Sequence, residues 1–532
     1  MFGTTEEQTK VIKDLQSTSC CQRCILRYLG SRIHSHYKEN NTSEVINKML
    51  YKKTSLENAT EKLMEESVES DETNTKNENV SEKMDDNEVD GTQTIEDELL
   101  CISCLGTLQD KNSSLFVSKV LEAVQEADHK YESFQLSVSL STQFILRQYA
   151  IWKHLQSTYR SLYSSHKLEE LCSIKDVLKW VYGPKLSSSL DVKFSSSSPF
   201  EIALSINNSA TSRECDFLNP GGSRNSEPPS KRRKKSQNYD GVPRTIVNKK
   251  LSDMSADELE RHYPWPPSTP TTMCTVTIAM NYAPAFVAGR YNKYSRTLSQ
   301  TPWFINGERK TPHSVEEYIC LPIKKHLKAK NYKFSSSGRE DVDVKTLGRG
   351  RPFLVELLDP HRALQVQQEI TKLQELINSE TVEISVNDLQ MVTKEETKML
   401  KEGEIAKTKS YKAKIWVAEA KTQEDLNILE TFKDITIYQK TPIRVLHRRN
   451  LATRERVIHS MEAQYIDDHH FELSLSTQAG TYIKEFVHSD FGRTEPNLGQ
   501  LLKCNVDILE LDVASVDLDW PKKLETGTNI DT

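Results

Sequence analysis

The chain is best interpreted from one stretch, Gly338-Arg339-Glu340-Asp341-Val342-Asp343-Val344. The stretch follows a small polar turn at 335–337 and alternates polar and apolar residues as a short strand does. Carboxylates at the end of a strand are where an enzyme with a cleft keeps a nucleophile or a proton carrier. An Asp in a surface turn is usually only solvated, so the interpretation needs support from elsewhere in the sequence.

Length and charge pattern predict several domains separated by polar segments. A chain of 532 residues is too long for a single core, which predicts two or three domains. Residues 61–98 hold fifteen Asp or Glu and three Lys, a local charge of −12; since the whole chain carries −6, the remainder carries +6. An acidic insert therefore masks a basic body that suits a polyanionic partner.

The predicted organisation is an accessory domain followed by an α+β domain. Residues 1–55 and 99–206 mix helical and strand patterns and predict an N-terminal α/β accessory domain, which a disordered acidic insert at 56–98 interrupts. Residues 207–254 are predicted to be a linker with a basic cluster. From 255 to 532, short strands alternate with helices, which predicts an α+β domain with a central mixed or antiparallel sheet and flanking helices.

Two C-x-x-C pairs, Cys21/Cys24 and Cys101/Cys104, predict a structural zinc site. Each pair can offer two thiolates to one ion, and two pairs complete a closed tetrahedral site. The acidic insert between them can loop out at modest entropic cost. A redox dithiol is the alternative for either pair alone, and Cys20 could replace its neighbour as a ligand.

The sequence predicts a soluble, intracellular protein in the nucleus and cytoplasm. No run of eighteen apolar residues exists that could span a membrane, and the N-terminus lacks the features of a targeting sequence. The basic run Lys231-Arg232-Arg233-Lys234-Lys235 is a candidate for nuclear import, although such runs also occur as solvated loops.

Two basic segments interleaved with aromatic residues predict RNA binding. Phosphates and splayed bases require this mixture of side chains, although either segment alone would be interpreted as a solvated loop. The candidate contacts are Arg290, Lys293, Arg296 and Trp303 in the first segment, and Arg444, His447, Arg448, Arg449 and Arg454 in the second.

Tyr411 and Lys484 are candidates whose ordinary interpretation is structural. By spacing alone, Tyr411 is a packed core tyrosine and Lys484 a surface lysine. A partly buried Lys484 would instead need a carboxylate partner, for which Asp341 is a candidate.

Three motifs in order resemble those of pseudouridine synthases. Gly338-Arg339-Glu340-Asp341 resembles the G-R-x-D signature of the TruA type, whereas Ala479-Gly480-Thr481-Tyr482-Ile483-Lys484 and Lys409-Ser410-Tyr411 resemble the G-T-Y-I-[RK] and K-x-Y motifs of the TruB type. With the N-terminal C-x-x-C pairs, the chain resembles the tRNA pseudouridine synthase 10 family over most of 255–520 and more loosely before it.

The resemblance implies isomerisation of uridine in the T-arm of tRNA, at positions 54 and 55, without a cofactor for the chemistry. Asp341 would be the catalytic residue, either as a nucleophile or as a base, with Asp343 as its rival. Tyr411 would stack on the flipped uracil and could assist proton removal at C5. Ile483 would lie beneath the base, and Lys484 would hold Asp341 ionised.

The resemblance also implies RNA contacts beyond the catalytic group. Arg339 would help to bind the substrate, and the segments 301–314, with Arg309 and Lys310, and 439–454 would close on the RNA. The N-terminal region would be a THUMP-like RNA-binding domain. We expect a monomer that binds tRNA, and other structured RNA as a further candidate, without a membrane partner. The alternative function is a non-catalytic nuclear RNA-binding scaffold.

Overall fold

The computed structural model describes residues 5–39, 41–50, 99–219, 241–401, 408–447 and 449–524. The chain divides into two compact units, one made of Met1–Ala127 with Glu132–Asn281 and one of Asp128–Tyr131 with Tyr282–Thr532. In the described ranges, no helix is long and apolar enough to cross a bilayer. The predicted acidic insert and the basic run at 231–235 lie outside the described residues, so the nuclear localisation stays a prediction.

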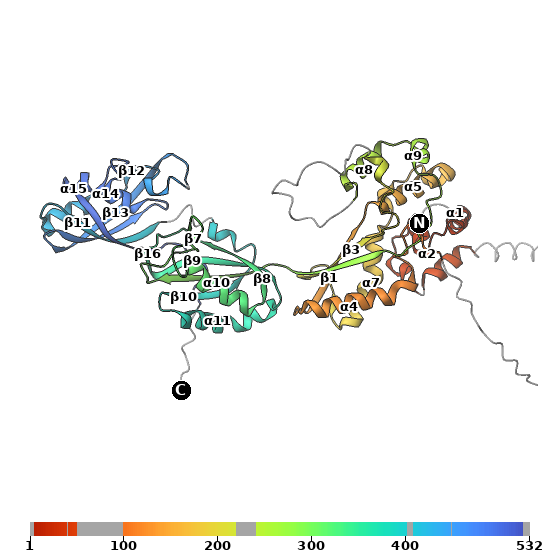
Figure 1. Cartoon of the computed structure of the whole chain (residues 1–532), viewed down its shortest axis with the longest axis horizontal. Helices are drawn as coiled ribbons and strands as arrows, with labels where there is room; N and C mark the ends of the chain where they lie inside the picture. The colour runs from red at the N-terminus through yellow and green to blue at the C-terminus, as the bar shows by residue number, and fades with distance from the viewer. Residues whose placement is uncertain are drawn as a thin grey trace, which may run out of the picture. The chain divides into compact units, whose positions relative to one another are not determined.

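The first unit combines helices with a four-stranded sheet (Figure 1). In the sheet order β2-β1-β3-β4, the strand β1 is parallel to both β2 and β3. This parallel core with helices has the predicted α/β character. Its helices are α1 (Thr5–Ser17), α2 (Gln22–Tyr28), α4 (Ser113–Ala127), α5 (Gln143–Thr158), α6 (Arg160–Tyr163), α7 (Ile174–Leu190), α8 (Arg244–Asp253) and α9 (Ala256–His262), and its strands are β1 (Ser133–Leu140), β2 (Lys193–Phe194), β3 (Phe200–Asn207) and β4 (Thr275–Tyr282).

The structure corrects the predicted linker at 207–254. Residues 244–253 form the helix α8, whose Val247 and Leu251 are buried in one cluster with Leu146 and Leu218. Such apolar burial ties α8 to the first unit. The two units meet in sequence at 281/282, later than the predicted boundary at 254/255, because β4 joins the sheet of the first unit.

The second unit is built on a ten-stranded mixed sheet, which confirms the predicted α+β fold. The order is β10-β5-β9-β16-β11-β14-β13-β12-β15 with β8 on β9, and the β16–β9 pair is parallel. Its strands are β5 (Ala285–Lys293), β8 (Ala329–Ser336), β9 (Lys345–Pro360), β10 (Ile384–Val392), β11 (Lys409–Val417), β12 (Ile435–Lys440), β13 (Thr453–Asp467), β14 (His470–Thr477), β15 (Thr494–Glu495) and β16 (Val506–Val516); the short hairpin β6 (Phe304–Ile305) and β7 (Glu308–Arg309) stands apart, and the main helices are α10 (Val315–His326), α11 (Val366–Glu380), α13 (Gln423–Leu426), α14 (Ile483–His488) and α15 (Leu498–Leu502).

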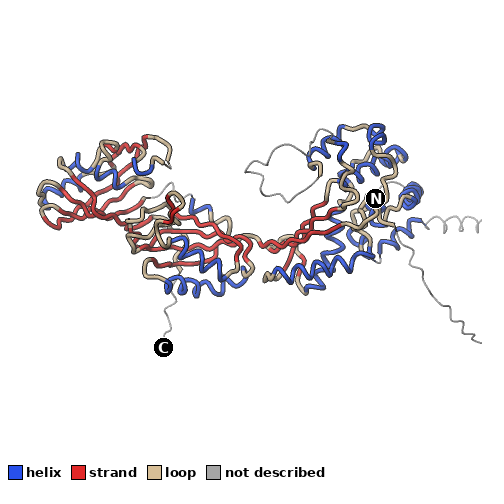
Figure 2. Tube along the Cα trace, viewed as in Figure 1, coloured by secondary structure: helices blue, strands red, loops and turns tan. Residues whose placement is uncertain are grey.

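Sequence patterns explain how these elements pack. In β14, every second side chain is buried, as expected of a strand with one face on a core. The helix α10 begins at Ser314, whose side chain accepts a hydrogen bond from the backbone N–H of Glu317. Figure 2 shows α10 and α11 beside the sheet region that contains β5, β9 and β10, and their side chains share one hydrophobic cluster. A second cluster lies around β11, β13, β14 and β16.

Candidate active site

The stretch 338–344 is a tight turn between β8 and β9. Gly338 has a φ of 93°, and a Cβ atom there would lie 2.7 Å from the Lys409 Nζ and 3.0 Å from an Arg351 guanidinium nitrogen. The backbone conformation therefore favours glycine here, and its missing Cβ leaves room for the two cationic side chains. The backbone N–H of Val344 donates to the carbonyl of Asp341 at 3.1 Å, which closes the turn.

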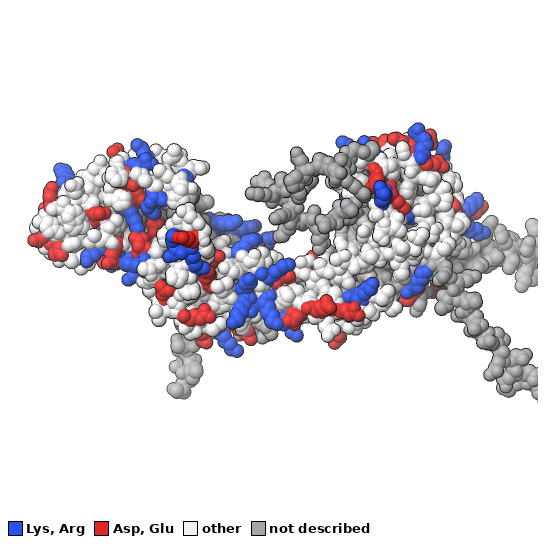
Figure 3. Space-filling view, in the orientation of Figure 1, with Lys and Arg blue, Asp and Glu red and all other residues white. Residues whose placement is uncertain are grey.

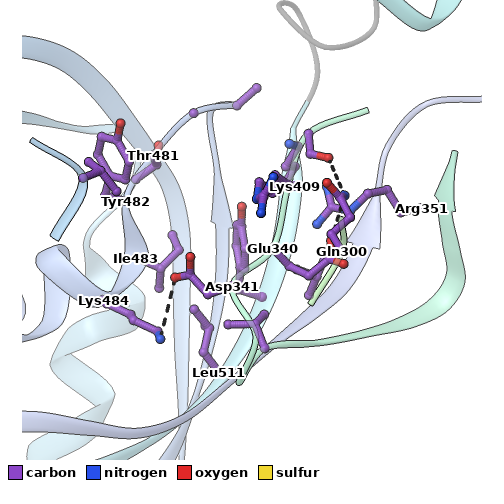
Figure 4. Close-up of a pocket in the computed structure, with 18 of the residues that line it drawn as sticks. Gln300, Glu340, Asp341, Arg351, Lys409, Thr481, Tyr482, Ile483, Lys484 and Leu511 are labelled. Atoms are coloured by element: carbon purple, nitrogen blue, oxygen red, sulfur yellow. Dashed lines mark hydrogen bonds and ion pairs between the residues drawn. The ribbon is translucent and has the colours of Figure 1, made fainter. Parts of the chain in front are cut away.

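Glu340 anchors this turn from inside the domain. Its buried carboxylate pairs with the Arg351 Nε at 2.8 Å and accepts the Tyr291 hydroxyl at 2.9 Å. The Gln300 side-chain amide donates to the Tyr291 hydroxyl at 2.8 Å and to the Gly338 carbonyl at 3.0 Å. Burial and the Glu340 charge both raise the pKa of Tyr291, so its hydroxyl remains a donor. Asp341, next to this anchored residue, lines the cavity shown in Figure 4.

Replacing Glu340 should destabilise the second unit. In Glu340→Gln, the buried Arg351 would keep its charge and lose its counter-ion, which we expect to lower the free energy of unfolding by about 3–5 kcal/mol. Urea denaturation measures this change. The matched control is Glu308→Gln, which breaks the exposed Glu308–Lys310 pair of 2.9 Å and should cost less than about 1 kcal/mol. Equal stability of the two variants would contradict a structural role for the buried pair.

Asp341 faces two cations. One carboxylate oxygen lies 2.7 Å from the Arg444 Nη1 and 3.7 Å from the Lys484 Nζ. Lys484 is closer to Asp343, at 2.6 Å. Burial opposes the ionisation of Asp343, but the Lys484 ammonium outweighs it and the pKa of Asp343 lies below its ordinary value. Asp341 lines the cavity together with Lys484, whereas Asp343 is absent from the lining.

Arg444 links Asp341 to a second carboxylate that the sequence did not indicate. Its Nε lies 2.6 Å from the Glu485 Oε1, and the Glu485 side chain is only 2% exposed. Burial disfavours the charged guanidinium, but Glu485 and Asp341 together raise the pKa of Arg444. Glu485 thus orients Arg444 toward Asp341. Arg444 lines the cavity, whereas the sequence predicted it in a loop that closes on the RNA.

Tyr411 and Ile483 provide the apolar part of the site. Tyr411 lies on β11 and packs against the cluster of β11, β13, β14 and β16, and burial raises its pKa. Ile483 is buried at the first turn of α14. The segment before it is held by Gln439, whose buried side-chain amide donates to the Tyr482 carbonyl and accepts its N–H, both at 2.9 Å.

These side chains surround a cavity of about 860 Å³. Cations outnumber carboxylates in its lining, so the cavity suits an anionic ligand. The charged and hydrogen-bonding members are Gln300, Ser336, Arg339, Glu340, Asp341, Arg351, Lys409, Tyr411, Arg444, Arg449, Arg456, Thr481, Tyr482 and Lys484, and the apolar ones include Val344, Ile483, Leu511 and Val513. Of these, Gln300, Arg351 and Leu511 were missed because no local motif marks them.

The structure corrects part of the predicted RNA contacts. Arg290 is 1% exposed and Lys293 is 0% exposed, so neither side chain can contact a phosphate. Arg290 donates instead to the backbone carbonyls of Gly350, Leu518 and Trp520. Arg296 is partly buried and pairs with Glu510 at 2.6 Å and Asp512 at 2.9 Å. These cations were misinterpreted because a sequence does not show that a backbone carbonyl can satisfy a buried charge.

The other predicted contacts lie at the surface or in the cavity. Trp303, Arg309 and Lys310 lie on or beside the β6–β7 hairpin, where Arg309 pairs with Glu317 at 2.5 Å. His447 and Arg449 are exposed, and Arg454 donates to the Thr441 hydroxyl at 3.0 Å; Arg448 lies outside the described residues. Figure 3 shows acidic and basic side chains interspersed on the visible face of the second unit. The cavity lining, in contrast, carries more cations than carboxylates.

Lys293 holds the backbone of the Asp341 turn. Its buried ammonium donates to the carbonyls of Leu298 at 2.8 Å, Val342 at 2.6 Å and Asp341 at 3.2 Å. The Lys293 side chain has three N–H donors only when it is protonated. Burial lowers the pKa of Lys293 to about 8, although Glu340, Asp343 and Asp341 oppose this effect.

Lys293 should give the domain a pH-dependent stability. Because its folded pKa lies below its unfolded value near 10.5, the unfolded chain binds the proton more tightly, and stability rises with pH between about 8 and 10.5. We expect wild type to gain about 3 kcal/mol over Lys293→Met across this window. Urea denaturation at a series of pH values measures the difference. For the exposed control Lys333→Met, the difference in unfolding free energy from wild type should not change with pH. The same pH-independent difference for Lys293→Met would contradict a buried charged lysine.

The four predicted metal ligands meet in the first unit. The Sγ atoms of Cys21, Cys24, Cys101 and Cys104 all lie within 4.8 Å of one another, so they could hold a metal ion; Cys20 does not belong to this group. The Cys21 and Cys104 sulfurs are 3.7 Å apart. Tetrahedral Zn–S bonds of about 2.3 Å require sulfur separations of about 3.8 Å, so the cluster fits zinc. The Cys21 backbone N–H and the Arg27 guanidinium donate to cluster sulfurs at 3.2 and 3.8 Å.

Comparisons with known proteins agree with both units. Residues 286–517 match the family model "Pus10, C-terminal", and residues 101–279 match "Eukaryotic Pus10, N-terminal". The chain is 41% identical to the Xenopus laevis and Homo sapiens proteins called tRNA pseudouridine synthase Pus10, over 99% of this chain and 100% of each relative. The Thermofilum pendens protein of the same name is 40% identical over 45% of this chain and 54% of its own length.

Solved structures give a weaker likeness. A Cbf5-Nop10-Gar1 complex matches 42% of this chain and 47% of that chain at 18% identity and a TM-score of 0.23. A pseudouridylate synthase matches 46% of this chain and 71% of that chain at 12% identity and a TM-score of 0.18. At these scores the assignment depends on the sequence relatives alone.

The family models and these relatives define the class: the protein is a pseudouridine synthase, an isomerase that converts uridine to pseudouridine. Within that class, the chain belongs to the Pus10 family.

Proposed function

We propose that this protein isomerises uridine in the T-arm of tRNA, with Asp341 as the catalytic residue. The observation that carries the proposal is the placement of Asp341, which lines a cation-rich cavity between Arg444 at 2.7 Å and Lys484 at 3.7 Å. The full-length relatives named tRNA pseudouridine synthases support tRNA as the substrate.

The reaction exchanges one glycosidic bond for another and needs no oxidant or reductant. The bond between C1′ and N1 breaks, a bond between C1′ and C5 forms, C5 loses its proton and N1 gains one. The base must leave the stack to rotate, which requires a closed pocket larger than uracil. The cavity of about 860 Å³ provides this room. Asp341 starts the reaction either as a nucleophile toward the sugar or base or as a base that removes a proton.

Neighbouring side chains would position the rotating base. Tyr411 and Ile483 supply an aromatic face and an aliphatic side chain at the same cavity. Because burial raises the pKa of Tyr411, its hydroxyl stays protonated and is a poor base. We therefore assign Tyr411 to stacking rather than to proton removal at C5. Arg444 and Lys484 would hold the Asp341 carboxylate in place until the base arrives.

Arg449 and Arg456 should contribute to phosphate binding, because both line the cavity and neither forms an ion pair in the described ranges. Neutralising both, as Arg449→Gln with Arg456→Gln, should weaken tRNA binding and reduce the slope of log K against log salt by about 0.7–0.9 for each lost contact. Binding measured across a salt series tests this expectation. The control is Lys333→Gln, which lies outside the cavity. If the salt slope of the double variant equals that of Lys333→Gln, Arg449 and Arg456 do not contact phosphates.

The T-arm assignment is tested by mapping pseudouridine in an unmodified tRNA transcript incubated with the full chain. We expect product at position 54, position 55 or both, and none at a position where uridine is replaced by cytidine. Product found only outside the T-arm would overturn the assignment of the site and leave the enzyme class intact.

We also propose that the four-cysteine cluster holds a structural zinc ion. The four sulfurs form a closed set, since all four ligand positions are thiolates and Cys24, Cys101 and Cys104 are buried. Such a site has no open position for a substrate or a water, so its role is to stabilise the first unit.

A further inference from the structure

The loop Ser489–Gly492, between α14 and β15, combines backbone strain with an exposed aromatic ring. Its four residues have φ values of 64°, 51°, 57° and 75°, all in the left-handed region. Three of them carry a Cβ atom, for which this conformation is unfavourable. Phe491 lies in the middle of this run with 93% of its surface exposed. Strain of this kind persists only where surrounding contacts enforce it, and it is common at functional sites.

Specific bonds fix this loop. The carboxylate of the buried Asp490 accepts the backbone N–H of Ile443 at 3.2 Å and pairs with the Arg493 Nε at 3.4 Å. The carbonyl of Ser489 accepts the backbone N–H groups of Arg493 at 2.9 Å and Thr494 at 3.0 Å. The backbone that carries Phe491 is therefore held in one conformation.

The loop adjoins the segments that build the proposed site. Ile443, whose N–H is bound by Asp490, directly precedes Arg444, which contacts Asp341 at 2.7 Å. The helix α14, which ends at the loop, begins with the cavity residue Ile483. The side chain of Arg493, directly after the loop, donates to the Thr441 carbonyl at 2.6 Å, which gives a second contact with the segment 441–444.

We infer that Phe491 is an RNA-contacting residue on which an unpaired base of the substrate stacks. This inference rests on the proposed function. An aromatic face held rigidly in water can stack on any base, and stacking is the usual way in which single-stranded RNA is bound. The exposed cation Lys440, whose backbone N–H donates to the Arg493 carbonyl at 2.9 Å next to this loop, favours a polyanion over an apolar protein surface.

The test compares Phe491→Ala with Phe491→Trp in binding unmodified tRNA. Loss of one stacked base should raise the Kd of Phe491→Ala about 5- to 150-fold, whereas Phe491→Trp should bind as wild type does. The rate of pseudouridine formation at saturating tRNA should stay within about 2-fold, because a stacking contact away from the reacting base affects binding rather than chemistry. As a control, Ile466→Ala, which truncates an apolar side chain on β13 that is 48% exposed, should bind tRNA normally.

Two results would overturn the inference. One is a wild-type Kd for Phe491→Ala. The other is weakened binding together with a lowered melting temperature, which would give Phe491 a structural role. If the proposed function fails, wild-type protein forms no pseudouridine in the tRNA. The comparison of tRNA affinities would still decide whether Phe491 contacts RNA.

Discussion

Asp341→Asn should reduce pseudouridine formation by at least about 10⁴-fold, the scale on which loss of a catalytic nucleophile or base acts. The amide keeps the shape of the side chain and removes the charge that would attack or accept a proton. Affinity for tRNA should stay within a few-fold, because the other cations that line the cavity are retained. Single-turnover rates with saturating enzyme, together with equilibrium binding, separate these two effects.

Asp343→Asn is the matched control for this prediction. Asp343 belongs to the same turn but pairs with Lys484 at 2.6 Å and has a side chain that is 61% exposed. Its replacement frees Lys484 without removing the carboxylate in the cavity, so we expect an effect below about 10-fold. An inactive Asp343→Asn beside an active Asp341→Asn would exchange the roles of the two carboxylates.

Cys101→Ser should remove the bound metal and unfold much of the first unit. A tetrahedral zinc site with four thiolates contributes on the order of 10–16 kcal/mol of apparent binding energy in small zinc modules, and that energy exists only in the folded state. We expect one zinc per wild-type chain, none in the variant, and a lower melting temperature for the first unit. Elemental analysis and calorimetry measure these quantities.

Cys172→Ser provides the control for the zinc prediction. Cys172 is also buried in the first unit but stands outside the four-cysteine cluster. It should keep the zinc ion and nearly all of the stability. A wild-type chain that carries no zinc, or a Cys101→Ser variant as stable as Cys172→Ser, would contradict a structural metal site.

Features with local sequence signals were predicted successfully. The strands alternate because one face of the sheet is buried, and the C-x-x-C pairs can be recognised because each places two thiolates on one ion. The three motifs likewise identified Asp341, Tyr411 and the Ile483–Lys484 pair before the structure brought them to one cavity.

Contacts between distant segments that carry no motif could not be predicted from the sequence. Arg444 reaches Asp341 across 103 residues, and its orientation depends on Glu485, a residue with no motif of its own that pointed to this role. Lys293 was misinterpreted for a related reason: its charge suggested solvent or RNA, whereas backbone carbonyls of the Asp341 turn satisfy it inside the domain. Pairings of this kind depend on the tertiary fold, which brings distant residues together.

The central claim is that the cavity around Asp341 is where uridine is rearranged. The most direct test is an experimental structure of Asp341→Asn bound to unmodified tRNA, in which the position of the target nucleotide is measured. We predict a flipped uridine against Tyr411, with its C1′ or C6 atom about 3–3.5 Å from the side chain at position 341. A target uridine that remains stacked in the RNA, or that lies outside this cavity, would contradict the claim.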